Sequence, residues 1–237
     1  MSTFKCRNAY RAIPWRNLMQ FPKHRGGVCL NLNGLSAVIL VLLLLPVFGP
    51  SQGSVSGEDL RREWREIQMS KSRETKKSWW RTIDVDRLNR FIDAGVEVDV
   101  TDRRGWTPLH SAARYNSNPE VLVALLEAGA AVDARDNTGA TPLHWAASEN
   151  ANVEIINSLL GADADVNARD KFGWLPIHTA AEGNSNPYVI NTLLTAGAKR
   201  NKRAYFVFFR PVFLLRHNPN MSEKDKKFAM ALLKEPE

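Results

Sequence analysis

Three histidines are the first residues whose type and spacing could support chemistry. His110, His144 and His178 follow one another at intervals of 34 residues. Histidine is the commonest metal ligand, but a metal needs its ligands to converge within about 2.1 Å of one point. Regular spacing instead places each histidine in its own structural unit, about 8–10 Å from the next. We therefore predict that these rings bind the local backbone or a neighbouring turn, and that they hold no metal.

Other catalytic patterns are missing from the sequence. It contains no Gly-x-Ser-x-Gly elbow, no phosphate-binding glycine loop, no His-Glu-x-x-His and no Cys-x-x-Cys. Asp102, Asp136 and Asp170 recur at the same interval as the histidines, which indicates a part in repeated turns. We predict a protein that is not an enzyme and binds no cofactor.

The interval belongs to whole segments and not only to histidines. Thr107–His110 returns at 141–144, and again as Leu-Pro-Ile-His at 175–178. A fixed period of this size indicates one small unit stacked on itself, because a single unit cannot bury its apolar face alone. Three full units span residues 102–135, 136–169 and 170–203.

Each unit carries the signals of two short helices. An Asp-x-x-Gly turn is followed by Thr-Pro, a helix start, and the second start is an Asn that precedes Pro or Val. The second helix is apolar at helical spacing and ends at Gly129 and Gly197. Asp163 occupies that position in the middle unit, where we expect a strained or shifted helix end.

These motifs, together with Gly-Ala-x-Val-Asn/Asp-Ala, resemble the ankyrin repeat. The 34-residue length and the Asn-Ser-Asn-Pro-Glu insertion are similar to ankyrin proteins of bacteria. The resemblance implies an all-α repeat solenoid, a stack of helix–turn–helix units with β-hairpin or turn fingers. It also implies a concave groove, lined by the fingers and the first helices, where protein partners usually bind.

The N-terminal flank extends this array. Residues 84–101 match a second helix and its exit, and we interpret them as a degenerate capping repeat. Residues 54–83 are predicted as a helical flank, in which Ser56 starts a helix that presents Leu60, Trp64 and Ile67 on one face.

The C-terminal flank, residues 204–237, is predicted to cap the open end of the stack. Its apolar stretch Tyr205–Leu215 is too short to span a bilayer and is expected to pack against the third repeat. Docking of a partner through the same stretch is the alternative. A last helix should begin at Ser222 and bury Phe228, Ala231 and Leu232.

Residues 1–53 are interpreted as an export segment. Six Lys or Arg and no acid precede an apolar core, Leu35–Phe48, which is followed by small residues. This order is typical of a cleaved signal peptide. An uncleaved anchor in the inner membrane and a true start at Met19 remain open. Cys6 and Cys29 both precede the core, so a cleaved chain would have no disulfide.

The net charge of +7 would suggest nucleic-acid binding, but the charge is distributed unevenly along the chain. Residues 82–198 hold eight basic and sixteen acidic side chains, whereas residues 199–237 hold ten basic and four acidic ones. A phosphate backbone requires clustered Lys and Arg on the contact face, so we predict no nucleic-acid partner.

A partner should meet positions that vary between the copies, since the repeated positions serve packing. Aromatic and Arg side chains are the usual energetic anchors of interfaces. The predicted partner-binding residues, at the fingertips and on the first helices, are Arg103, Arg104, Trp106, Arg114, Tyr115, Trp145, Glu149, Phe172, Trp174 and Glu182. For the three tryptophans, packing against neighbouring repeats is the alternative.

The sequence thus predicts a monomeric, non-catalytic protein-interaction scaffold with a protein partner of unknown identity. Export would place it in the bacterial envelope, periplasmic or secreted after cleavage. Two alternatives remain: an adaptor of an envelope enzyme or transporter anchored through Leu35–Phe48, and a secreted effector that binds a host protein.

Overall fold

The computed structural model describes residues 55–199 and 210–234. The chain divides into two units, residues 1–53 and 54–237. The predicted export segment, Met19 and both cysteines therefore lie outside the described residues, as does the Tyr205 end of the apolar stretch. Among the helices that the structure describes, none is long and apolar enough to cross a bilayer.

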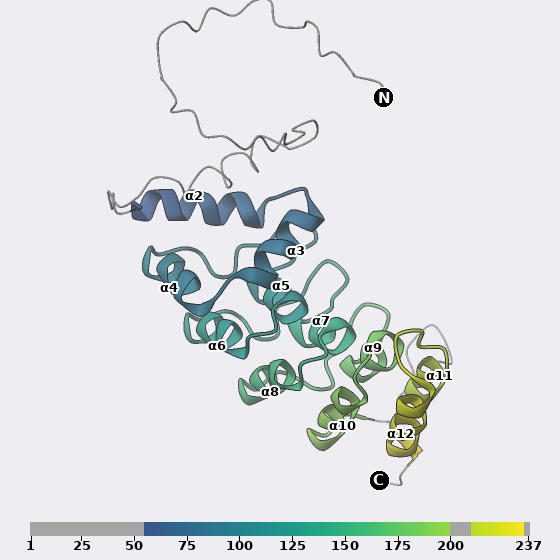
Figure 1. Cartoon of the computed structure of the whole chain (residues 1–237). Coiled ribbons are helices and arrows are strands. Elements are labelled where there is room, and N and C mark those ends of the chain that lie inside the picture. Colours follow the sequence, from purple (N-terminus) through teal and green to yellow (C-terminus); the bar gives the residue numbers. More distant parts are fainter. Residues whose placement is uncertain (1–54, 200–209, 235–237) are drawn as a thin grey trace, which may run out of the picture. The chain divides into compact units, whose positions relative to one another are not determined.

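The helices of residues 55–234 stack in two layers (Figure 1). The inner layer consists of α3 Arg73–Thr82, α5 Pro108–Tyr115, α7 Pro142–Glu149, α9 Pro176–Gly183 and α11 Pro211–Arg216. The outer layer consists of α2 Gly57–Gln68, α4 Val85–Asp93, α6 Pro119–Glu127, α8 Val153–Gly161, α10 Pro187–Thr195 and α12 Glu223–Lys234.

The helices begin where the sequence signals place them. Inner helices α5, α7 and α9 each start at a proline, whose missing N–H costs nothing in a first turn. Each outer helix of the three repeats is capped by an asparagine: Asn118, Asn152 and Asn186 accept a backbone N–H two residues ahead at 3.0 Å. These helices have only eight or nine residues, so their stability depends on packing.

The core differs between the layers. Pairs of alanines, such as Ala112-Ala113 and Ala146-Ala147, are fully buried and let the inner helices approach closely. The outer layer buries larger side chains, such as Ile155 and Leu159, at the helical spacing predicted. Burial of each such side chain contributes about 1.5–3 kcal/mol, which is how a chain of short helices becomes a stable stack.

A ladder of asparagines joins successive inner helices at their C-terminal ends. The side-chain amide of Asn150 donates to the carbonyls of Ala113 and Asn116 at 2.9 and 2.7 Å. Asn184 and Asn218 repeat the arrangement one and two units later. These amides satisfy helix-end carbonyls that would otherwise be buried without a donor.

Aromatic side chains close the N-terminal end of the stack. Trp64 of α2 packs at ring-centroid distances of 6.0 Å against both Trp79 and Trp80 of α3, and at 5.5 Å against Phe91 of α4. Helix α2 contacts both α3 and α4, and these stack on α5 and α6 respectively. The face expected for α2 is confirmed, since Trp64 is buried and Leu60 and Ile67 pack beside it.

Another helix pair, α11 and α12, covers the C-terminal end. Helix α11 packs on α9, and α12 packs on α10. The expected face of α12 was wrong by about one residue: Ala229 and Leu233 are buried, while Phe228 is 42% exposed. Phe228 does not enter the core. It packs on the exposed ring of Tyr188 in α10, at 5.6 Å between centroids.

The fingers are turns. Within the described residues they contain no strand, so of the hairpin or turn form that the resemblance implied they take the turn. Gly105 has a φ of +76°, which favours glycine. A Cβ there would also lie 2.9 Å from the backbone nitrogen of Asn137 in the next finger, so both the backbone conformation and the close approach require glycine. Asp163 takes a φ of 64° at the position of Gly129, which confirms a strained helix end.

Candidate functional site

Each finger is held by the aspartate that begins it. One carboxylate oxygen of Asp102 accepts the backbone N–H groups of Arg104 and Trp106 at 2.8 and 2.9 Å. Asp136 and Asp170 accept the equivalent pairs of N–H groups in the second and third fingers. The fingers are also joined edge to edge, since the N–H of Asn137 donates to the carbonyl of Arg104 at 2.8 Å. Side chains on the fingers therefore project from a fixed support.

The repeated histidines connect each inner helix to the next finger. His110 Nδ1 accepts the Thr107 N–H at 3.1 Å, so Nε2 carries the proton and donates to the carbonyl of Ala140 at 3.2 Å. His144 makes the same contacts with Thr141 and with the carbonyl of Trp174. Burial lowers the pKa of both rings. The predicted structural role is confirmed for these two histidines.

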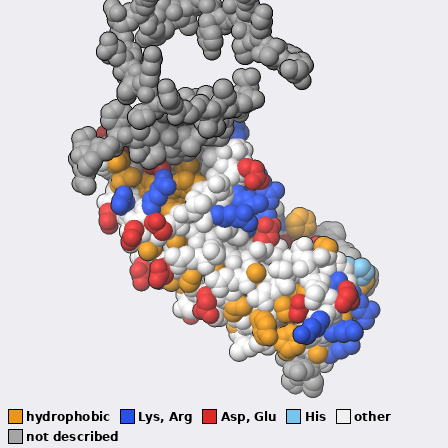
Figure 2. Space-filling model, viewed as in Figure 1, with side chains coloured by type: hydrophobic (Ala, Val, Ile, Leu, Met, Phe, Trp, Pro, Cys, Tyr) orange, Lys and Arg blue, Asp and Glu red, His pale blue; other side chains and the backbone are white. Residues whose placement is uncertain are grey.

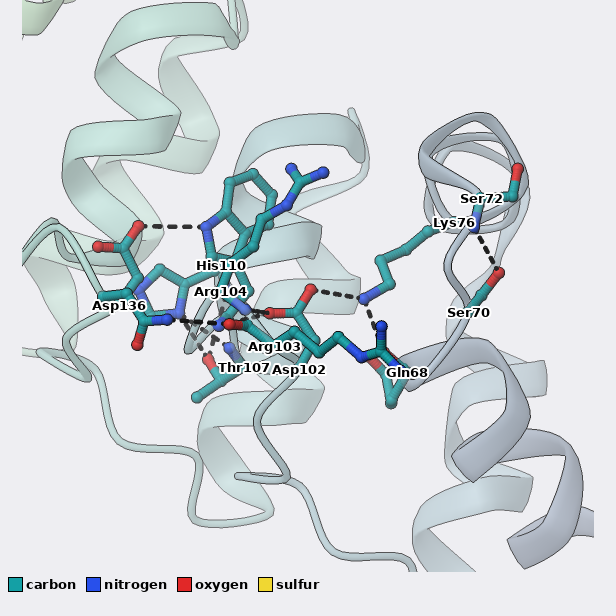
Figure 3. Close-up of polar contacts among 12 residues, drawn as sticks. Gln68, Ser70, Ser72, Lys76, Asp102, Arg103, Arg104, Thr107, His110 and Asp136 are labelled. Carbon is teal, nitrogen blue, oxygen red and sulfur yellow. Dashed lines mark hydrogen bonds and ion pairs between the residues drawn. The ribbon is translucent and has the colours of Figure 1, made fainter.

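The second carboxylate oxygen accepts different donors in Asp102 and in Asp136. In Asp102 it accepts Lys76 Nζ of α3 at 2.8 Å, within a pair of buried side chains that ties the N-terminal helices to the first finger (Figure 3). Lys76 also donates to the carbonyl of Gln68 at 2.7 Å. Burial alone would raise the pKa of Asp102, but the hydrogen bonds from Lys76 and the turn lower it overall.

In Asp136 the second oxygen accepts two indoles, Trp106 Nε1 at 3.1 Å and Trp145 Nε1 at 3.0 Å. The two rings lie 4.6 Å apart between centroids. Burial would raise the pKa of Asp136, yet the hydrogen bonds from Thr138, from Trp145 and from the turn hold it below its usual value. One carboxylate thus orients both tryptophans.

Arg114 fills the space that these tryptophans enclose. Its guanidinium carbon lies 4.5 Å from the centroid of the Trp145 ring, 5.2 Å from that of Trp106 and 5.1 Å from that of Tyr115. Its other contact is an ion pair with Glu149. We refer to Asp136, Trp106, Arg114, Trp145 and Glu149 as the closed site, because the chain's own arginine occupies it.

An open cleft lies between the second and third repeats. It is lined by Trp145, Ser148, Asp170, Phe172, Trp174 and Glu182, among others. Phe172 is 55% exposed, whereas Trp174 is half-buried. Burial raises the pKa of Glu182. Aromatic faces and carboxylates therefore meet in a hollow that includes no Lys or Arg among its described lining residues.

A basic cleft lies on the other side of the closed site, next to α3. Its cationic lining residues are Lys71, Arg73, Lys76, Arg103 and Arg104. Figure 2 shows Lys and Arg side chains gathered beside α3. The Tyr115 hydroxyl, followed by the charge of Glu149, raises the pKa of Arg73. Sequence reasoning missed Lys71 and Arg73 because they precede the recognisable repeats, where no register indicated which face they occupy.

The structure brings the ten predicted partner-binding residues to one side of the stack, at the fingers and inner helices. Exposed members are Arg103, Arg104, Glu149, Phe172 and Glu182. Half-buried members are Tyr115, Trp145 and Trp174. Trp106 and Arg114 are buried, at 4% and 8% exposure, and they pack against each other and against Trp145 in the closed site.

Comparison with known families agrees with this geometry. The family model described as ankyrin repeats, in three copies, matches residues 83–170. This chain contains ankyrin repeats. The matched range runs from the end of α3 to the start of the third finger, and the helices on either side continue the same two-layered stack. The search of curated proteins finds no match for the chain.

The match to this family model carries a general expectation. Ankyrin repeats suggest a protein–protein interaction scaffold and imply protein partners, and the family is generally non-catalytic. The fold itself is a frame on which many surfaces are presented, so the identity of a partner must be argued from the side chains of this particular chain.

Proposed function

We propose that this protein is a non-catalytic scaffold that binds a protein partner along its concave surface. By concave surface we mean the fingers at residues 102–106, 136–140 and 170–174 with the adjoining sides of α5, α7 and α9. The observation that carries the proposal is the gathering of exposed Arg and aromatic side chains, with two clefts, on this one side. Such residues supply most of the binding energy of interfaces.

The rigidity of the support favours the same function. The fingers are joined by backbone hydrogen bonds, and the aspartates fix the turn of each finger. A partner would therefore meet a preformed surface and would lose little affinity to ordering of the scaffold. Acidic side chains gather along the outer helices on the face that Figure 2 shows, in contrast to the clustered Lys and Arg that a nucleic acid requires.

Capture of a partner by the full chain tests the proposal. A variant with Arg104→Ala, Tyr115→Ala and Trp145→Ala removes one fingertip cation and two half-buried rings of the concave surface. The matched control removes Val123 and Tyr188, which are 39% and 59% exposed on α6 and α10 of the outer layer. The proposal predicts a partner that is captured by the wild type and the control and lost by the triple variant. Equal capture by all three chains would contradict it.

The cellular location that we propose is the bacterial envelope, reached through residues 1–53. Support comes from the basic start, the apolar core Leu35–Phe48 and the small residues that follow it. N-terminal sequencing of the native protein distinguishes the two forms. A new N-terminus near residue 52 or 54 indicates a soluble, exported scaffold, whereas an intact residue 1 indicates the membrane-anchored adaptor.

A further inference from the structure

We propose that the open cleft binds an arginine side chain of the partner protein. The proposal deepens the function above and rests on it, because it specifies the chemistry of one contact on the same surface. It is derived from a comparison within the molecule: the chain shows in its closed site how it holds a guanidinium group, and the open cleft presents similar walls without one.

The closed site shows three features of guanidinium binding. Two indole rings and a phenol lie within 5.2 Å of the Arg114 guanidinium carbon. A carboxylate, Glu149, pairs with its edge. A flat, weakly hydrated cation suits such a place because its faces stack on rings while its edge donates hydrogen bonds.

Translation by the 34-residue period shows what the open cleft keeps and what it lacks. One period after Trp106 and Trp145 stand Ala140 and Thr179, so the aromatic walls of the cleft come from other registers. They are Trp145 itself, which lines both places, and Trp174, which lies two periods after Trp106. The register of Arg114, however, holds Ser148, a short side chain that lines the open cleft. The cleft therefore has aromatic walls, to which Phe172 adds a third, and space where the first repeat places its arginine.

The carboxylates of the open cleft have fewer partners than their counterparts. Glu182 lies one residue before the register of Glu149, and no described residue forms an ion pair or hydrogen bond with its carboxylate. Asp170 uses one oxygen for the turn, and no described donor reaches the other, whereas Asp136 gives its second oxygen to two indoles. A partly desolvated carboxylate gains from a cation that stays close to it.

These features select arginine over other side chains. An apolar side chain would cover the rings but would also bury Glu182 without a partner, which costs free energy. A lysine would supply the charge as a compact, strongly hydrated ammonium, with no flat face for Phe172 and Trp174. Only a guanidinium group meets both the rings and the acid, so we expect arginine to bind more tightly than lysine, and both more tightly than a neutral side chain.

Titration of the full chain with capped tripeptides tests this inference without knowledge of the partner. The probes are acetyl-Gly-Arg-Gly-amide and its citrulline counterpart, which has the same shape and no charge. The readout is the NMR signal of the indole N–H groups. We expect the arginine peptide to shift the signals of Trp145 and Trp174 at millimolar concentrations and to leave Trp64 unchanged. We expect the citrulline peptide to bind at least about tenfold more weakly, the equivalent of about 1.4 kcal/mol.

Two variants connect the signal to the cleft. Glu182→Gln removes the charge from an exposed side chain with no described partner, so the variant should fold at least as stably as wild type while the preference for arginine over citrulline is lost. Ser148→Arg places an arginine at the register of Arg114 and should block the peptide. The inference is wrong if the two peptides shift the same signals equally, if neither shifts them, or if Glu182→Gln binds the arginine peptide as well as wild type does.

Failure of this inference can be told apart from failure of the proposed function. If the arginine peptide does not bind while the triple variant of the concave surface still loses its captured partner, the scaffold function holds and the arginine contact is wrong. If the peptide binds and no partner is lost by the triple variant, the cleft recognises arginine but the concave surface is not the partner's site.

Discussion

The closed site and the open cleft lie one repeat apart on the same side of the stack, and they differ in the positions that supply their walls and in what fills them. In the closed site Arg114 lies between Trp106 and Trp145, and Asp136 holds both indoles. In the open cleft Trp174 faces a hollow, and Ser148 stands where the arginine would be. The difference shows that similar side chains can stabilise the stack between one pair of repeats and remain available for binding between the next pair.

Substitution of the finger aspartates should give the largest difference in stability between the closed site and the open cleft. In Asp136→Asn an amide N–H₂ replaces one carboxylate oxygen and must face either the backbone N–H groups of the turn or the two indole N–H groups. Because a donor then faces donors, we expect a loss of about 3 kcal/mol in the free energy of unfolding. Asp170→Asn can keep its single oxygen toward the turn, with a loss of about 1 kcal/mol. Urea denaturation followed by circular dichroism measures both. Equal losses would show that the second oxygen of Asp136 has no special role.

Removal of the internal cation should have a smaller effect. Arg114→Ala takes away a buried side chain that contacts three rings, and we expect a loss of about 2 kcal/mol in unfolding free energy. Glu149 remains half-exposed and can be solvated, which limits the cost. Glu182→Ala, on the exposed acid of the open cleft, should change stability by less than about 0.5 kcal/mol. A destabilisation by Glu182→Ala as large as that by Arg114→Ala would mean that the cleft is a structural element.

The smallest expected effect is on the pH dependence of stability, to which Asp136 and Glu182 should contribute in opposite directions. The pKa of Asp136 is lowered in the fold from 3.8, so its contribution to stability is present above that pH and is lost as the pH falls through the folded pKa. The pKa of Glu182 is raised from 4.5, so its contribution is present below that pH and is lost as the pH rises through the folded pKa.

Stability measured from pH 3 to 7 checks these signs. Asp136→Asn should differ most from wild type near pH 7 and least near pH 3. Glu182→Gln should be slightly more stable than wild type near pH 7, with the difference disappearing toward pH 3. If Glu182→Gln were instead less stable at pH 7, the carboxylate would have a stabilising partner in the fold, and the comparison with Glu149 would fail.

Much of the frame could be predicted from local sequence signals. Pro108, Pro142 and Pro176 start the inner helices, and Asn118, Asn152 and Asn186 cap the outer ones, as the repeat predicted. These signals are reliable because a helix end depends on the backbone groups of a few neighbouring residues.

The C-terminal end contained a signal that was overlooked. Asn218 and Asn220 continue the series of paired asparagines at 34-residue spacing, and Asn218 donates to the carbonyls of Ala181 and Asn184 as its counterparts do. The Thr-Pro-Leu-His motif is absent there, so the asparagine spacing is the part of the repeat pattern that continues into this end of the sequence. Asparagine was the better marker of a further helix pair because its amide binds the preceding unit directly.

The sequence by itself determined the repeat, the helix starts, the structural place of His110 and His144, and the side of each unit where variable residues gather. Only the tertiary structure decided which of those residues remain available to a partner. Trp106 and Arg114 looked equivalent to Trp174 as candidates, yet their exposure depends on residues 30 to 39 positions away. Asp136 and Trp145 contact Trp106, and Trp145 and Glu149 contact Arg114. A repeat pattern specifies what each unit contains, whereas contacts between stacked units depend on which side chains meet across the interface.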